Sequence, residues 1–207
     1  MSQSVAEPVL YYTHNMNPRV AVAVARYLQA PVRLVRYSPK GDDRDLFLPL
    51  NANTLAPLLV ENGTSIWETD AVALRLSQMT GGNFWPPEHA VEMMKWVSWS
   101  AHHFTKAGGA LVWHNFIGMP FMGSPNPAVI ADHVAEFHRY AAILDATLAT
   151  RKWLVGSSPT YADFRLATAL PFAGQASIPV ERYGNIVSWH NRLNAIDAWR
   201  EPFAGIE

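Results

Sequence analysis

The sequence predicts an α/β part followed by an all-α part. In the first 80 residues, β-prone runs and helical patterns follow one another in the order β-α-β and then β-β-α, which indicates a mixed sheet with helices. Residues 81–87 contain two glycines and two prolines, which favour a linker over any regular element. From Glu88 onward no β-like run of any length remains and helical patterns dominate. We therefore expect a domain over residues 1–80, a linker over 81–87 and a helical domain over 88–207.

The first β-α-β order rests on two apolar runs with a helix between them. Val9–Tyr12 is a short β-prone run and predicts the first strand. Pro18 suits the first turn of a helix, with Asn17 as its cap, and apolar residues then recur at helical spacing. Val32–Tyr37 alternates apolar and basic residues, which predicts a strand with one face toward water. The polar stretch Ser38–Asp45 is expected to be a loop.

The following stretch predicts a hairpin and a helix. Asn62-Gly63 is a strong hairpin signal, because both positions of a type I′ turn need positive φ. A proline at the entrance fits the first residue of a strand, where no ladder hydrogen bond is lost. The expected elements are a strand from Pro57 to Val60, a strand at Ser65–Trp67, and a helix at Ala71–Met79 capped by Thr69 or Asp70.

The second part predicts long helices joined by loops. One capping box is specific: Thr160 can accept from the backbone N–H of Asp163, whose carboxylate can accept from the N–H of Thr160. The expected elements are a helix at Glu88–Val112 with a possible bend at Gly108-Gly109, a loop at Ile117–Asn126, and helices at Pro127–Thr150, from Thr160, and at about Tyr183–Trp199.

Composition excludes several classes of protein. The chain has 207 residues, 49% of them hydrophobic, which is enough for one large or two small cores. Its formal net charge of -1 argues against nucleic-acid or anionic membrane partners. The absence of cysteine excludes disulfides, a cysteine nucleophile and thiolate metal sites. The eight histidines show no zinc-ligand spacing, so no metal is expected. No apolar run approaches the roughly 20 residues of a membrane span, and no signal peptide is visible, so we expect a cytoplasmic protein.

Two groups of residues, one in each part, resemble the glutathione transferase family. In the first part the residues at the family's motif positions are Asn51, Pro57, Leu59, Glu68, Thr69, Ala71, Val72 and Arg75. In the second part, Gly156–Asp163 resembles the family's buried N-cap. The chain departs from the family at Ala52, Leu55 and Ala56, and Leu55 replaces a lysine that often reaches the glutathione glycine carboxylate.

The resemblance implies a thioredoxin-like first domain, an all-helical second domain, glutathione as co-substrate and a homodimer. The helix carrying Arg75 would lie at the dimer surface. The implied reaction is the attack of the glutathione thiolate on a small apolar electrophile. The alternatives are a glutathione-dependent isomerase, dehalogenase or peroxidase, or a glutathione- or ligand-binding protein of the same fold without significant catalysis.

The group that activates the thiol should follow the first strand, where family members place Tyr, Ser or Cys. Between Tyr11 and Val20 this chain has neither Ser nor Cys. Aligning the Arg19-Val20 pair with serine-type members nominates His14 and Asn15, and aligning the first strand nominates Tyr12 or Thr13. The candidates in order are His14 and Asn15, then Thr13, then Asn17. The plainer interpretations are that Asn17 is only a helix cap and that His14 is an exposed loop residue.

The remaining site residues also come from the resemblance. The peptide bond before Pro57 is expected to be cis, and the backbone of Ala56 would pair with the cysteinyl part of glutathione. Glu68 and Thr69 would bind the γ-glutamyl end, at a helix N-terminus. The glutathione-binding set is thus Asn17, Leu55, Ala56, Pro57, Glu68 and Thr69. The electrophile is expected between the domains, near Met16, His102, His103, Lys106, Trp113 and Phe116, although aromatic residues at helical spacing are more often core.

Overall fold

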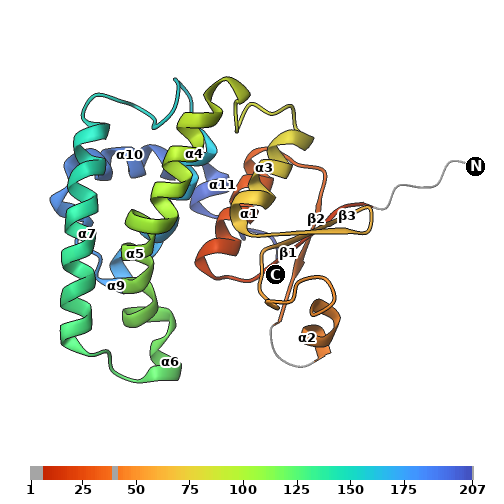
Figure 1. Ribbon diagram of the computed structural model, residues 1–207, viewed down its shortest axis with the longest axis horizontal. Helices are drawn as coiled ribbons and strands as arrows, with labels where there is room; N and C mark the ends of the chain where they lie inside the picture. The colour runs from red at the N-terminus through yellow and green to blue at the C-terminus, as the bar shows by residue number, and fades with distance from the viewer. Residues whose placement is uncertain (1–6, 39–41, 207) are drawn as a thin grey trace, which may run out of the picture. The chain divides into compact units, whose positions relative to one another are not determined.

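The computed structural model describes residues 7–38 and 42–206, and the chain packs as two compact units. The sheet unit holds the described residues up to Trp85 together with those from Asp197 onward, and the helical unit holds Pro86–Ile196 (Figure 1). The division between Trp85 and Pro86 falls inside the stretch expected to be a linker. Residues 197–206, which the sequence assigned to the helical domain, instead pack in the sheet unit.

The strands of the sheet unit form a four-stranded mixed sheet in the order β2-β1-β3-β4 within the described residues. β1 runs parallel to β2 and antiparallel to β3, and β3 and β4 form an antiparallel hairpin. The expected β-α-β then β-β-α order is therefore present, with one helix inserted between β2 and β3 and a second helix contributed by residues 197–200. The elements are β1 (Val9–Tyr12), α1 (Met16–Tyr27), β2 (Arg33–Arg36), α2 (Asp42–Phe47), β3 (Leu58–Glu61), β4 (Thr64–Trp67), α3 (Thr69–Met79) and α11 (Asp197–Arg200).

The hairpin between β3 and β4 has the predicted turn. Asn62 has a φ of 50° and Gly63 a φ of 77°, so both central residues adopt the left-handed conformation of a type I′ turn. The loop expected at Ser38–Asp45 overlaps α2, whose first residue is Asp42, and its residues 39–41 lie outside the described part of the chain.

Both long helices of the sheet unit start earlier than predicted. α1 begins at Met16 with Asn15 as its N-cap, so the prediction that Asn17 is the cap is wrong. A proline at the third helical position is tolerated because the first N–H groups of a helix have no partner inside it. α3 begins at Thr69 with Glu68 as its N-cap, and neither Thr69 nor Asp70 has the capping role that the sequence suggested.

The core of the sheet unit lies between the sheet and its helices. α1 packs against α3, and both supply fully buried aliphatic side chains. The main contributors are Leu10, Leu58 and Leu59 from the strands, Val20 and Val24 from α1, and Val72 and Leu76 from α3. Burial of an aliphatic side chain of this size contributes about 1.5–3 kcal/mol, so this cluster stabilises the packing of α1 and α3 against the sheet.

The helical unit contains one long helical run, 90–117, beside the 22-residue helix α7 (Figure 1). The run has two π-helical segments, which the sequence did not predict. The elements are η1 (Pro87–His89), α4 (Ala90–Trp99), the π-helical η2 (Ser100–Phe104), α5 (Thr105–Val112), the π-helical η3 (Trp113–Ile117), α6 (Met119–Met122), α7 (Pro127–Leu148), α8 (Tyr161–Leu166), η4 (Ala167–Phe172), α9 (Ala173–Ala176), η5 (Val180–Arg182) and α10 (Gly184–Asn194).

Gly108 and Gly109, where the sequence suggested a possible bend, lie within the α-helix α5. A Cβ on Gly108 would lie 3.0 Å from the Cβ of Ala169, so the glycine allows close approach of η4. Two predictions for residues 117–200 need correction. The stretch expected to be a loop after Ile117 contains the short helix α6, and the last predicted helix divides into α10 in the helical unit and α11 in the sheet unit.

Candidate functional site

The sheet register brings three chain segments to one edge of the sheet. Tyr11 lies opposite Leu58, and Leu58 lies opposite Trp67. Because β1 and β4 both run antiparallel to β3, the ends of β1 and β4 meet the start of β3 at this edge. The segments that continue from these points are 13–15, 56–57 and 68–69. They include the residues that the sequence nominated for activating the thiol and for binding glutathione, with the exception of Tyr12, Asn17 and Leu55.

The 13–15 loop joins β1 to the N-terminus of α1. The N–H of Asn15 donates to the Thr13 hydroxyl oxygen at 3.4 Å, a weak turn-type contact. The Asn15 side chain makes no capping hydrogen bond, and both Asn15 and His14 are exposed. Asn17 lies within the first turn of α1 and is also exposed. The loop therefore presents a hydroxyl, an imidazole and an amide at a helix N-terminus, where the partial positive charge favours an anion such as a thiolate.

The His14 imidazole lies in an environment that favours its neutral form. Partial burial and, secondarily, the positive charge of Arg36 lower the pKa of His14 below its usual 6.5. Arg36 is the β2 residue paired with Tyr12, which places its backbone at the same end of the sheet. A neutral imidazole has one N–H donor and one acceptor nitrogen, so at neutral pH it can donate to a thiolate or accept a thiol proton.

The 56–57 segment is held by the loop that precedes it. The peptide bond between Ala56 and Pro57 is cis, as the family resemblance predicted. Asn51 is 4% exposed, and its side-chain amide donates to the Leu55 carbonyl at 2.8 Å while its oxygen accepts from the Asn53 N–H at 3.0 Å. Asn51 thus fixes the chain just before the cis peptide. Leu55 itself is 64% exposed.

The 68–69 segment forms the N-terminus of α3. Glu68 has a φ of 72° and a ψ of 130°, a conformation that non-glycine residues rarely adopt. Such backbone conformations are concentrated at ligand sites, where the surrounding fold maintains them. The Glu68 side chain is exposed, whereas Thr69 is 3% exposed. The strained residue therefore directs an acidic side chain outward beside a helix N-terminus.

The residues nominated for the electrophile come from both units. Met16 is the first residue of α1 in the sheet unit, and the other five are in the long helical run of the helical unit. His102 and His103 are in the π-helical η2, and Trp113 and Phe116 are in the π-helical η3. π-helical turns within α-helices occur frequently at functional sites.

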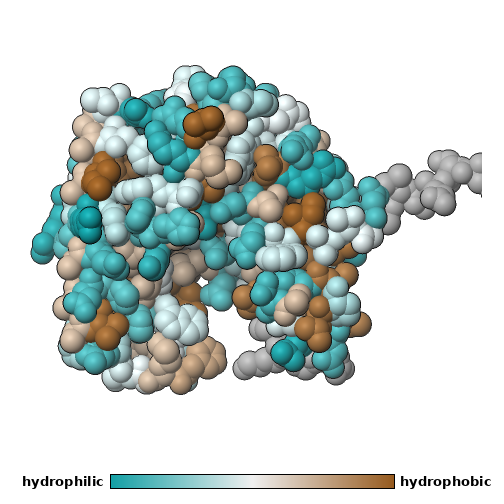
Figure 2. Space-filling model, viewed as in Figure 1, coloured by the Kyte–Doolittle hydropathy of each residue, from teal (hydrophilic) through white to brown (hydrophobic). Residues whose placement is uncertain are grey.

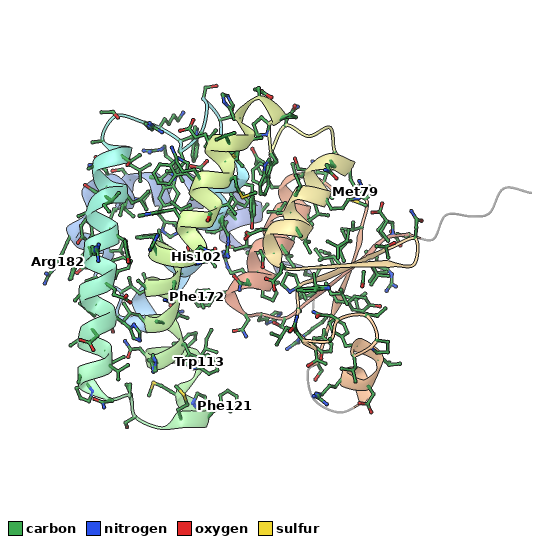
Figure 3. The ribbon with its side chains drawn as sticks, viewed as in Figure 1. Met79, His102, Trp113, Phe121, Phe172 and Arg182 are labelled. Carbon is green, nitrogen blue, oxygen red and sulfur yellow. The ribbon has the colours of Figure 1, made fainter. Side chains whose placement is uncertain are left out.

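The two adjacent histidines point to different surroundings. The His103 ring packs against Tyr140 of α7 with the centroids 4.9 Å apart. His102, which is labelled in Figure 3, is exposed. Lys106, one turn later, is also exposed. His103 is thus partly a packing residue between helices, and His102 is the one available to a ligand.

Exposed apolar side chains gather near the end of the long helical run. Trp113 is 42% and Phe116 41% exposed, and Phe121 on the neighbouring α6 is 72% exposed. Trp113 and Phe121 are labelled at the same end of the unit in Figure 3, and Figure 2 shows pale and brown side chains there. This surface has the chemistry required for an apolar ligand.

Sequence reasoning missed three residues of the sheet unit that shape this site. Asn51 was recognised as part of a motif, but its buried hydrogen bonds become visible only in the folded loop. Arg36 was assigned to the solvent face of a strand, and nothing local indicated its proximity to His14. Phe203, whose ring centroid is 4.4 Å from that of His14, is 189 residues away in the sequence, and no local pattern connects them.

Across residues 7–38 and 42–206, no group of three or more His, Cys, Asp or Glu side chains is arranged to hold a metal ion. None of the helices in the described part of the chain is both long and apolar enough to cross a membrane.

A thioredoxin-like sheet unit with a cis-proline edge, combined with an all-helical unit, defines the glutathione transferase type of fold. The family model described as "Glutathione S-transferase, C-terminal domain" matches residues 113–197. Glutathione S-transferase 3 of Zea mays is 26% identical over 215 residues, covering 96% of this chain and 95% of the maize protein. Glutathione S-transferase GstB of Escherichia coli K12 is 26% identical over 164 residues, covering 75% and 76% of the two chains.

Solved structures agree on the fold. A glutathione S-transferase-I bound with lactoylglutathione superposes with a TM-score of 0.85 at 15% identity, covering 96% of this chain and 99% of the other. At that identity the structural likeness supports the fold alone. Taken with the sequence matches, it shows that the chain is similar to glutathione transferases in both sequence and fold.

Proposed function

We propose that the protein is a glutathione transferase that binds glutathione at the edge of its sheet and activates the thiol for attack on a small apolar electrophile. The observation that supports this proposal best is the convergence of segments 13–15, 56–57 and 68–69 at one sheet edge. Each of these segments offers a different chemistry. They provide donors for a thiolate, a backbone for pairing, and an acid beside a helix N-terminus.

In this proposal each part of glutathione has a partner. The backbone N–H and C=O of Ala56 pair with the cysteinyl residue as a short added strand. The carboxylate of Glu68 receives the γ-glutamyl ammonium, and the N–H of Thr69 receives its carboxylate. The glycine end would lie near Leu55, which cannot supply the lysine charge found in many members of the family. The electrophile would be taken by apolar side chains such as Trp113 and Phe116.

A binding protein without significant catalysis is the second candidate. It is favoured by the exposed Leu55 and by the absence of Ser and Cys between Tyr11 and Val20. Calorimetry with glutathione, combined with turnover assays on a panel of apolar electrophiles, separates the two. Binding with turnover supports the transferase, and binding without turnover supports the second candidate. The absence of glutathione binding would contradict both candidate functions.

Glu68→Gln is expected to weaken glutathione binding about tenfold or more. The change keeps the size and the backbone conformation of the residue but removes the charge, and a hydrogen bond to a charged group contributes about 1.5–3 kcal/mol. The matched control is Asp45→Asn on the exposed surface of α2, which makes the same change of charge in the same unit. If calorimetry gives equal dissociation constants for wild type and Glu68→Gln, the proposal that Glu68 binds glutathione is contradicted.

We also propose that the protein is a homodimer through the face of α3 that carries Arg75. Arg75 donates two hydrogen bonds to the Glu61 carboxylate, at 2.6 and 2.7 Å, which holds the guanidinium in a fixed position on β3 and α3. Sedimentation at micromolar concentration is expected to give twice the monomer mass. Arg75→Glu, which places two acids side by side, should shift the equilibrium toward monomer, and Arg44→Glu on α2 should not. A wild-type species of monomer mass would contradict the proposal.

A further inference from the structure

The residues after Asp197 return to the sheet unit and pack along α1. α11 is a single short helix, and its Trp199 is completely buried. The chain then continues through turns from Pro202 to Gly205. We call this stretch, residues 197–206, the return segment.

Two arginines of α1 hold the backbone of the return segment. The Nη2 of Arg19 donates to the carbonyl oxygen of Trp199, and also to that of Arg200 at 3.3 Å. The Arg19 guanidinium also lies 4.8 Å from the centroid of the Trp199 ring. The last carbonyls of a helix have no partner inside it, so Arg19 caps α11. Arg19 is 7% exposed, and burial lowers its pKa to about 10, which leaves it charged at neutral pH.

Arg26 holds the next part of the segment. It is seven residues after Arg19, two helical turns along, and therefore projects from the same side of α1. Its Nη1 donates to the carbonyl oxygens of Pro202 at 2.8 Å and of Ala204 at 2.7 Å. These two residues flank Phe203, so the backbone on both sides of Phe203 is fixed by one guanidinium.

The Phe203 ring reaches the loop proposed to activate the thiol. Its centroid is 4.4 Å from that of the His14 imidazole and 5.5 Å from that of Tyr12, with interplanar angles of 32° and 18°. Tyr12 is buried, whereas His14 is exposed. The His14 ring also stacks on Tyr12 with the centroids 6.1 Å apart, and among the described residues the imidazole has no hydrogen-bond partner.

We propose that Phe203 is a positioning residue for His14: held by Arg26, its ring sets the orientation of the imidazole at the N-terminus of α1. This inference rests on the proposed function for its catalytic meaning. An exposed histidine on a loop samples several side-chain conformations, and a ring packed on one face removes part of that freedom. Orienting a catalytic group in advance raises the rate without requiring a contact with the substrate.

The surroundings of His14 allow its titration to report on this contact. Arg36 of β2 is the charged group that acts on the imidazole, and Tyr12 of β1 presents a buried aromatic face. On the return segment, Glu201 is exposed and pairs with Arg200 at 3.5 Å. With Arg36 unchanged, removing the Phe203 ring removes part of the desolvation of His14, so the histidine should titrate at higher pH.

The first experiment uses NMR titration of His14 in the full chain without glutathione. In Phe203→Leu and Arg26→Ala the His14 titration is expected to move up toward pH 6.5, the free imidazole value. Phe203→Tyr keeps the ring and should titrate as the wild type does. Arg33→Ala, which removes an exposed cation of β2, is the control for Arg26→Ala. A His14 titration unchanged by Phe203→Leu overturns the proposal, whatever the enzyme does.

The second experiment measures steady-state kinetics with glutathione and an apolar electrophile. Phe203→Leu is expected to lower kcat about tenfold, with the KM for glutathione unchanged, because Phe203 orients a group without binding the ligand. In the His14→Ala background the same change should have no further effect, since coupled residues are not additive. A merely structural Phe203 would lower kcat equally in both backgrounds, which would also overturn the proposal. If the wild type shows no turnover but His14 still shifts in the NMR titration, the proposed function fails and the packing of Phe203 on His14 is supported.

Discussion

Asp163→Ala is expected to lower the free energy of unfolding by about 3–5 kcal/mol, because each buried donor left without a partner costs about 1–3 kcal/mol. The carboxylate is completely buried and forms the predicted capping box with Thr160. It also accepts from the Leu154 N–H at 3.0 Å and from the Trp189 indole N–H at 2.9 Å. A capping box alone would give a loss of only about 0.5–2 kcal/mol.

Denaturant unfolding of the full chain measures this loss. Burial raises the pKa of Asp163, while hydrogen bonds from Thr160, Leu154 and Trp189 act in the opposite direction. Asp163→Asn keeps the volume but aims an amide N–H at groups that are themselves donors, so it should also be destabilising. Asp132→Ala, at an exposed position of α7, is the control and should change stability by less than about 0.5 kcal/mol. Unchanged stability together with a collapse of turnover would make Asp163 a catalytic residue.

His14→Ala is expected to raise the pKa of the bound glutathione thiol by about one unit. A donor to the thiolate contributes about 1.4 kcal/mol, which corresponds to one pKa unit. At a pH below the thiol pKa, the thiolate fraction, and with it kcat, would fall about tenfold. Ultraviolet titration of the bound thiolate measures the shift directly in wild type, His14→Ala, Asn15→Ala and Thr13→Ala.

The pH profile separates the protonation states of His14. An imidazolium donor would make activity fall as pH rises past the pKa of His14, and this pKa is lowered by burial and by Arg36. At neutral pH and above, His14 is therefore mainly neutral, and we expect activity to rise with pH as the thiol ionises, without a falling limb above pH 7. If all four proteins titrate the bound thiol as in free solution, the 13–15 loop does not activate sulfur and the protein is a glutathione-binding module.

The local features of the site could be predicted because each has a strong local signal. Asn62-Gly63 indicated the hairpin, and Thr160 with Asp163 indicated the capping box. Both depend on residues close together in the chain, where turn chemistry and capping preferences act. The cis peptide before Pro57 was implied by the family resemblance and not by a local signal.

The features that could not be predicted depend on contacts made only after folding. The π-helical segments η2 and η3 cannot be distinguished from ordinary helix by hydrophobic spacing. The starts of α1 and α3 were misplaced because Pro18 and Thr69 fit several positions in a first helical turn. The Phe203–His14 contact has no local pattern, since aromatic residues at either position are compatible with many environments.

The return segment also determines when the sheet unit can be completed during synthesis. Arg19 bonds to the Trp199 carbonyl across 180 residues, with the whole helical unit between them in the chain. During synthesis the continuous stretch 86–196 therefore emerges from the ribosome before the partners of Arg19 and Arg26 do. The helical unit can fold as a contiguous chain. Until the return segment has emerged, Arg19 and Arg26 of α1 lack the carbonyl oxygens to which they donate in the folded protein. Contacts of such long sequence separation form late, so the surroundings of His14 would be the last part of the sheet unit to become ordered.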